Sequence, residues 1–251
     1  MKTIIIYFFI FFSVLQAREL GQTEITTEEG IEVYQKEKYY LLKKNVEIES
    51  DNFTLTAQRV KAYFEKDLYN ITEIYSTGNV VFKSNQGLKV LGNEVDHNIK
   101  KEKISIRGEG SYLQNNDFTM ISDGSIEINN FSGEFKLHGP NSKLITEDIQ
   151  IIGEDIKGSY IVVDGINVIE KLDIKDKIKV NITTETSNMF AKKAKYEKKE
   201  NTMELFENVL IIRDNESIMG DYAKMNTLDE SYFVKTNQSK KVKAILERTD
   251  E

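Results

Sequence analysis

The sequence predicts an all-β protein built from repeated hairpin units, and three observations support this fold class: residues alternate with period two, helical periodicity is scarce, and one spacing recurs four times. Apolar and polar residues alternate in residues 46–48, 104–106, 126–128, 149–151 and 178–180. Such alternation gives a strand one buried and one solvated face. Residues 189–196 could form one or two helical turns, but they fit the repeat better.

Four segments share one frame. Each has an apolar anchor, a small residue 11 to 13 positions later, and another apolar or small residue three positions beyond that. The anchors are Val46, Val80, Ile178 and Val209, and the small residues are Ala57, Gly92, Ala191 and Gly220. Asn45 and Asn79, which begin the first two units, lie 34 positions apart. A period in the thirties is typical of repetitive architectures.

One hairpin unit cannot bury its own apolar face, so successive units should stack and build a continuous interior. The small residue should lie where a strand bends or where backbones approach closely. Weaker copies of the unit are expected around residues 108–110 and Ser142. The alternative is an ordinary β-sandwich in which the spacing is coincidental.

The N-terminus has the layout of a secretory signal peptide over residues 1–17. Lys2 precedes an apolar run over residues 4–15, and Ala17 offers a small residue before the cut. The run is shorter than the roughly 20 residues of a membrane span. Leu15 stands where a small residue is preferred, so an uncleaved membrane anchor is the alternative. We expect a mature chain that starts near Arg18, with residues 18–251 forming one domain.

Composition and motifs argue against several classes of function. The net charge of −7 argues against nucleic acid as a partner, because phosphate neutralisation needs clustered Lys and Arg. The chain has no cysteine, which excludes disulfides, thiolate metal sites and a lipoprotein anchor. His97 and His138 have no partner motif, and we interpret both as turn or surface residues. No phosphate-binding loop or nucleophile elbow is present, so neither an enzyme nor a cofactor is expected.

The repeat resembles the OstA-like family of periplasmic lipopolysaccharide-transport proteins. The resemblance lies mainly in residues 208–212, 218–223 and 242–246, and residues 78–95 repeat the pattern. It implies a twisted antiparallel β-jellyroll, open at both ends, with an apolar interior and no catalytic residues. It also implies head-to-tail self-association and a bridge between an inner-membrane LptC-like and an outer-membrane LptD-like component. The length of this chain departs from the family, which indicates extra hairpins in its middle.

Two sets of residues follow from this hypothesis. Alternation gives the side chains expected to face lipid A acyl chains, although each could be a plain core residue: Val46, Ile48, Leu55, Val80, Phe82, Leu88, Val90, Ile104, Ile106, Phe118 and Met120. The strands near the two ends should expose backbone edges for assembly, through Ile31, Val33, Val242, Ala244 and Leu246.

Two other functions stay open at this point. The first is a membrane-anchored LptC-like component of the same pathway, which differs in keeping the N-terminal segment. The second is a carbohydrate-active enzyme on a β-helix, which should carry carboxylates at repeat-equivalent positions on one exposed face. The repeat-equivalent positions in this chain are apolar or small instead.

Overall fold

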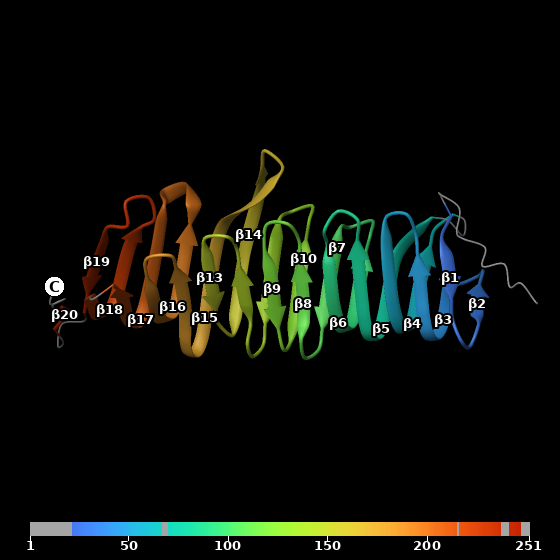
Figure 1. Ribbon diagram of the computed structural model, residues 1–251, viewed down its shortest axis with the longest axis horizontal. Coiled ribbons are helices and arrows are strands. Elements are labelled where there is room, and N and C mark those ends of the chain that lie inside the picture. Colours follow the sequence, from blue (N-terminus) through green and yellow to red (C-terminus); the bar gives the residue numbers. More distant parts are fainter. Residues whose placement is uncertain (1–21, 67–69, 215, 237–240, 247–251) are drawn as a thin grey trace, which may run out of the picture.

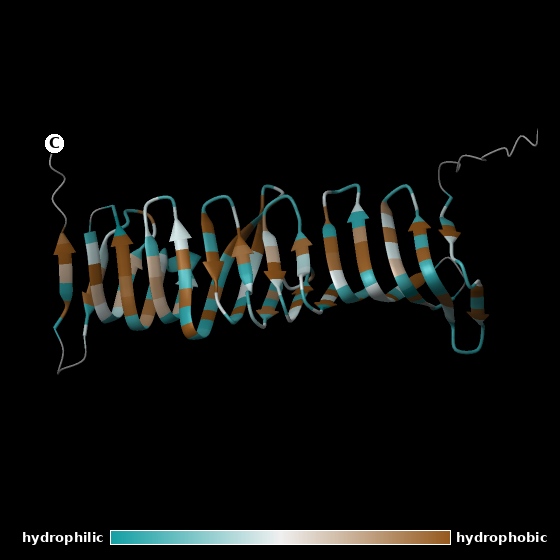
Figure 2. Cartoon of the chain, turned by 60° about the horizontal axis from the view of Figure 1, so that its bottom comes forward, coloured by the Kyte–Doolittle hydropathy of each residue, from teal (hydrophilic) through white to brown (hydrophobic). Residues whose placement is uncertain are grey.

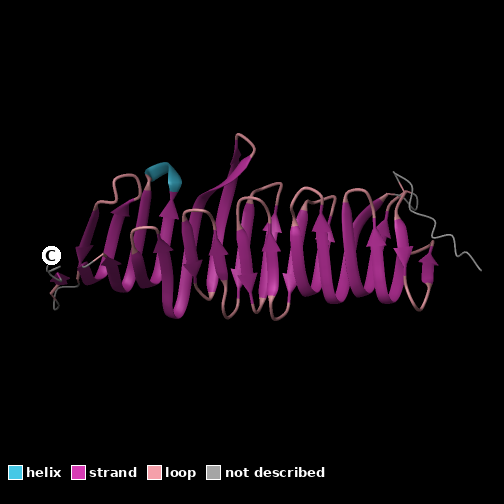
Figure 3. Ribbon diagram, in the orientation of Figure 1, coloured by secondary structure: helices cyan, strands magenta, loops and turns pink. Residues whose placement is uncertain are grey.

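The computed structural model describes residues 22–66, 70–214, 216–236 and 241–246. These residues form one 20-stranded sheet in which all strand pairs are antiparallel, and the one short 3-10 helix among them is η1 (Lys198–Glu200). The chain progresses along the long axis of the molecule, from β1 and β2 at one end to β19 and β20 at the other (Figure 1). Figure 3 shows that strands make up most of the described chain and that loops and turns join them. The prediction of an all-β, antiparallel, open jellyroll is confirmed.

The strands form three groups: long strands towards the two ends of the molecule, shorter strands in its middle, and short outermost strands. The long strands are β3 (Tyr39–Glu49), β4 (Phe53–Phe64), β5 (Ile71–Ser84), β6 (Lys89–Asn98), β15 (Ile166–Thr184), β16 (Asn188–Glu197), β17 (Thr202–Arg213) and β18 (Glu216–Asn226). Between them lie β7 (Lys103–Arg107), β8 (Ser111–Gln114), β9 (Thr119–Ser122), β10 (Ser125–Asn129), β11 (Glu134–His138), β12 (Lys143–Ile145), β13 (Ile149–Ile152) and β14 (Asp155–Val163). The outermost strands are β1 (Glu24–Thr26), β2 (Ile31–Tyr34), β19 (Tyr232–Lys235) and β20 (Lys243–Leu246).

Each long strand bends in its middle and so contributes to two half-sheets. Half-sheet 1 contains β2, β7, β10, β11, β14 and β19, and half-sheet 2 contains β1, β8, β9, β12, β13 and β20. For example, the second half of β6 pairs with β7 while its first half pairs with β8. The inner faces of both half-sheets contribute to a single hydrophobic core. The interior therefore runs along the whole molecule, between two facing half-sheets.

β-Bulges produce the bends in β3, β5 and β17. Between the paired residues on either side of each bend, these strands have two residues where the partner has one. The two residues of each bulge have a left-handed backbone in all three strands: Lys44 and Asn45, Gly78 and Asn79, and Glu207 and Asn208. Asparagine tolerates this conformation better than most residues, and glycine adopts it without a steric penalty. The Asn that begins three of the four predicted units thus marks a corner of the fold.

The small residues of the repeat lie directly opposite the residue that follows each corner. Val46 pairs with Ala57, Val80 with Gly92, and Val209 with Gly220. A Cβ atom on Gly220 would lie 2.5 Å from Val234 Cγ1 and 2.8 Å from the Lys235 carbonyl oxygen. The prediction that the small residues stand at strand bends and close backbone approaches is confirmed.

One anchor of the repeat was assigned to the wrong residue. Ile178 is 87% exposed, because residues 176–179 bulge out of β15 between Lys175 and Val180. Asp176 Oδ1 accepts hydrogen bonds from the backbone N–H groups of Ile178 and Lys179 and so stabilises this bulge. The buried residue opposite Ala191 is Val180, which takes the place expected for Ile178.

The middle of the molecule continues the same layers with strands that break at the corner. β7 and β8 are separated at residues 108–110, and β11 and β12 at residues 139–142. Buried serines take the place of the small residues here, at Ser111, Ser122 and Ser142. The extra hairpins expected in the middle are therefore further layers of the same jellyroll.

The outermost strands each pair with one neighbouring strand within the described part of the chain. β1 and β2 pair with β3, and β19 and β20 pair with β18. The side chains of Ile31, Val33, Val242 and Leu246 are exposed there, and so is Ala244. The signal peptide predicted over residues 1–17 lies outside the described residues. Among the residues described, no helix is long and apolar enough to cross a membrane.

Candidate functional site

The largest feature of the molecule is the apolar interior between the two half-sheets, which we call the trough. Apolar side chains from the inner faces of both half-sheets fill it, and Figure 2 shows apolar and polar residues alternating along the strands. The largest side chains that are fully buried in it are Leu42, Ile106, Leu113, Met120, Ile126, Leu137, Leu144, Ile151, Ile156, Ile174, Ile182 and Met189. These residues come from both ends and from the middle of the chain, so the apolar interior is continuous.

The residues predicted to face lipid all lie in the trough or against it. Val46, Ile48, Leu55, Val80, Val90, Ile104, Ile106, Phe118 and Met120 are buried members of the core. Phe82 and Leu88 are half-buried and pack against it. Alternation therefore assigned the strand residues among them to the correct face, and Leu88 and Phe118 lie in turns directly before β6 and β9. Contact of any of these side chains with a ligand stays a prediction.

Side chains along the trough are fully buried, as in a close-packed core. A void of about 20 Å³ lies in the N-terminal part, lined by Leu55, Ile74, Ser76, Phe82, Val90, Val95, His97 and Ile104. That volume suits about one water molecule. The half-sheets must therefore separate, or their side chains must rearrange, before a larger apolar ligand can enter.

His97 lies on the inner face of β6, so our interpretation of it as a turn or surface residue was wrong. Val95 is buried, and His97 follows it two positions later on the same face of the strand. The imidazole ring lies 6.3 Å from the ring of Phe82, which belongs to the opposite half-sheet. Burial lowers the pKa of His97, and the nearby Asp96 carboxylate opposes that shift only in part. An imidazole thus lies inside a trough that is lined mainly by apolar side chains.

His138 lies outside the trough and is half exposed. Its Nδ1 atom lies 2.6 Å from Asp155 Oδ1, across the pair formed by β11 and β14. In the described part of the chain, no group of three or more His, Asp or Glu side chains could hold a metal ion.

Two rows of turns lie along the side of the trough opposite the bent corners, and we call this side the mouth. The row on half-sheet 1 includes exposed lysine pairs in three turns: Lys36 and Lys38, Lys100 and Lys101, and Lys198 and Lys199. Carboxylates lie between them, and one of these, Glu65, forms an ion pair with Lys100. The turns of half-sheet 2 at residues 50–52, 85–88, 115–118, 146–148 and 185–187 have carboxylates and amides but no lysine or arginine. The two rims of the mouth thus differ in charge.

Polar contacts connect the two rims at two places. Asp117, in the turn between β8 and β9, accepts hydrogen bonds from Asn167 at the start of β15. Closer to the C-terminus, Glu230 forms an ion pair with Arg213 and accepts a hydrogen bond from Thr186 Oγ1 at 3.1 Å. These contacts hold the half-sheets together on the side opposite the corners.

A second hollow lies on the outer face of half-sheet 1, outside the trough. Its volume is about 560 Å³, and it is lined by Asp173, Lys175, Lys193, Lys195, Phe206, Glu207, Asn208, Asp221 and Tyr222. Lys193 forms an ion pair with Glu207, and Lys175 with Asp173. Burial and a hydrogen bond to Glu204 raise the pKa of Tyr222 to about 12. The hollow is a mixed-charge surface in which most of the cations are already paired.

Comparison with known proteins yields structural likeness only. No family model and no curated protein matches the sequence. Among solved structures, 15 chains match. One is LptH from Pseudomonas aeruginosa, described as the LptA-homologous periplasmic component of the lipopolysaccharide transport device. It shares 9% identity at a TM-score of 0.44, and the match covers 52% of this chain and 95% of that one.

Proposed function

We propose that this protein binds lipopolysaccharide by taking the acyl chains of lipid A into the trough. The observation that carries the proposal is the continuous apolar interior between two facing half-sheets, from β3 to β18, with one long mouth. Each methylene that moves from water into such an interior contributes about 0.8 kcal/mol. Several long acyl chains therefore give affinity without specific polar chemistry, which agrees with an interior lined almost entirely by apolar side chains.

The rims suit an amphiphile with an anionic head group. Acyl chains that enter through the mouth leave the head group outside, next to the turns. The lysine pairs on half-sheet 1 offer cations for phosphates, whereas the turns of half-sheet 2 offer none. We therefore propose that the phosphates lie along the rim of half-sheet 1, and that this part of the affinity falls with rising salt.

The proposal includes a place in the cell and a set of partners. The protein acts in the periplasm and bridges an inner-membrane LptC-like and an outer-membrane LptD-like component. Unpaired backbone groups on the outermost strands would join copies head to tail. N-terminal sequencing of the protein from its native envelope distinguishes a cleaved signal peptide from an LptC-like anchor.

The proposed function is tested by identifying the lipid that the protein carries. The full chain is purified from its native envelope without detergent, and the bound lipid is extracted and analysed by mass spectrometry. We expect lipid A-containing species in a fixed ratio to protein. Purification without bound lipid, together with failure to bind purified lipopolysaccharide afterwards, would contradict the proposal.

A further inference from the structure

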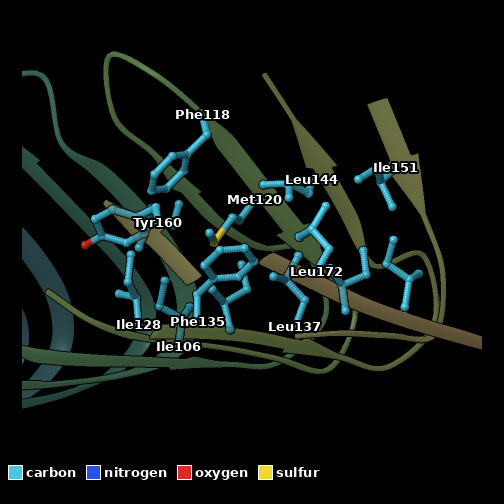
Figure 4. Close-up of a cluster of buried hydrophobic side chains, with 14 of the residues drawn as sticks. Ile106, Phe118, Met120, Ile128, Phe135, Leu137, Leu144, Ile151, Tyr160 and Leu172 are labelled. Atoms are coloured by element: carbon cyan, nitrogen blue, oxygen red, sulfur yellow. The ribbon is translucent and has the colours of Figure 1, made fainter. Parts of the chain in front are cut away.

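The hairpin formed by β14 and β15 extends beyond the sheet at mid-length, and its base contacts the rim of half-sheet 2. Figure 1 shows that it rises above the neighbouring turns. At its base, the ring of Tyr160 lies 5.6 Å from the ring of Phe118, which comes from half-sheet 2. Figure 4 shows these two rings together at one side of the buried cluster that contains Met120 and Phe135. We call residues 160–169 the ribbon.

A carboxylate on the opposite rim holds the ribbon in place. Asp117 Oδ2 accepts two hydrogen bonds from Asn167. It lies 2.9 Å from the backbone nitrogen of Asn167 and 2.5 Å from Asn167 Nδ2. Asn115 Oδ1 fixes the turn around this carboxylate, because it accepts hydrogen bonds from the backbone of Asp117 and Phe118. Asp117 and Asn167 therefore form a latch between the two half-sheets.

Tyr160, at the base of the ribbon, still donates a backbone hydrogen bond to the Gly133 carbonyl oxygen, whereas residues 161–169 pair only within the hairpin. The pairing of β14 with β11 ends at Ser159, and the pairing of β15 with β16 begins at Lys171. A register shift between Ser159 and Tyr160 marks the point at which the hairpin leaves the sheet. An isolated two-stranded ribbon is at best marginally stable, so this one depends on its contacts at the mouth. The register shift is thus a natural hinge.

From this geometry we infer that the ribbon is a lid that must open for each lipid that occupies or passes the middle of the trough. The inference rests on the proposed function and adds the step that controls the entry and passage of lipid. A bound lipid has its chains inside and its head group outside, so the covalent link between them must pass through the mouth. A latch that joins the two rims blocks that link, and the latch must break before the lipid can lie beneath the ribbon or move past it.

The lid is tested by locking the latch with a disulfide in the full chain, which has no cysteine of its own. The double variant Asp117→Cys with Asn167→Cys is compared oxidised and reduced, and purified lipopolysaccharide is the probe. A photoreactive phenylalanine analogue replaces Phe118 beneath the ribbon, or Phe82 away from it as the matched position. We expect both positions to crosslink lipid in the reduced protein. Oxidation should lower crosslinking at least tenfold at residue 118 and leave residue 82 unchanged.

Oxidation that lowers crosslinking equally at residues 118 and 82 would show a general effect on lipid binding and would overturn the lid. Equal crosslinking at residue 118 in the oxidised and reduced proteins would overturn the lid, and so would crosslinking in the reduced protein at residue 82 alone. Absence of crosslinking at both positions in the reduced protein would instead contradict the proposed function.

A second variant tests the lid without a disulfide. Asp117→Ala removes the acceptor of both latch bonds and should speed lipid loading at residue 118 several-fold. Asp148→Ala, in the next turn of the same rim, should leave the rate unchanged. Equal rates for these two variants would also overturn the lid.

Discussion

Phe82 is the residue at which the lipid-binding hypothesis is easiest to probe, because it is half-buried and lines the void of the trough. Its ring stacks on Phe53 at 5.4 Å. Phe82→Asp places an unpaired charge in this apolar setting. We expect the variant to bind lipopolysaccharide at least tenfold more weakly in a direct binding assay, while Phe82→Leu keeps most of the affinity. Full affinity in a Phe82→Asp protein with a wild-type circular dichroism spectrum would show that lipid lies elsewhere.

His97 gives the protein a stability that depends on pH. Burial lowers the pKa of His97 in the fold below its ordinary value. The unfolded chain therefore binds a proton more readily than the folded one as the pH falls through about 6.5, and folding stability is lost in that range. Between about pH 7.5 and about pH 5.5 this loss is at most about 1.4 kcal/mol.

The variant His97→Gln removes the titrating group and should lose less stability over the same range. Denaturant unfolding of both proteins at the two pH values measures the difference. The two proteins differ only at residue 97, so the comparison isolates the effect of this side chain. An identical loss of stability in wild type and variant would contradict the buried neutral imidazole.

At the residue scale, alternation predicted faces well and predicted local exceptions poorly. It placed residues such as Ile104 and Met120 inside because a strand has a strict period of two. The same rule, counted from Val95, places His97 inside. We predicted a turn or surface position for His97 because of its residue type. Ile178 was misassigned because a bulge breaks the period, and the only local sign of that bulge is Asp176 two positions before it.

At the scale of the strand, the corner needs a residue without a large side chain. A Cβ atom added to Gly220 of β18 would lie within 3 Å of atoms of β19. Gly220→Val should therefore cost about 1 to 3 kcal/mol of stability, as overpacking usually does. Thermal unfolding of Gly220→Val and of Met219→Val, the same new side chain at the exposed neighbouring position, measures this cost. Equal melting temperatures would show that the corner tolerates a side chain.

The elements at the two ends of the molecule were more predictable than those in the middle. Asn and a small residue 12 or 13 positions later mark the corners of β3 to β6 and of β17 to β18. In the middle, glycines at strand breaks and buried serines such as Ser122 and Ser142 perform the same task. A search for Gly or Ala alone misses serine, although serine is also small and satisfies its hydroxyl by a hydrogen bond to a nearby carbonyl.

At the scale of the whole molecule, the layers stack into an elongated body with two open ends. With about 4.8 Å between neighbouring strands, the stack from β1 to β20 extends roughly 60 Å. The ends expose different strands, so contact between copies would be head to tail and would not close into a ring. We therefore expect oligomers that grow with protein concentration, as measured by analytical ultracentrifugation.

Proline substitution in β20 tests whether the C-terminal edge makes that contact. Adjacent residues of a strand point their N–H groups to opposite sides. One of the two variants Ala244→Pro and Ile245→Pro therefore removes a hydrogen bond to β18, and the other removes a donor that points away from the sheet. The variant that keeps the wild-type melting temperature should form smaller oligomers. Wild-type assembly by both variants would exclude this edge.

The central claim, that lipid lies inside the trough, is tested most directly by photocrosslinking at neighbouring residues of β5. A photoreactive analogue at Phe82 points into the trough, and one at Lys83 points to the solvated outer face. In cells that make lipopolysaccharide, we predict crosslinks to lipopolysaccharide at residue 82 and at most a tenth of that yield at residue 83. Equal yields at both positions, or a higher yield at residue 83, would contradict binding between the half-sheets.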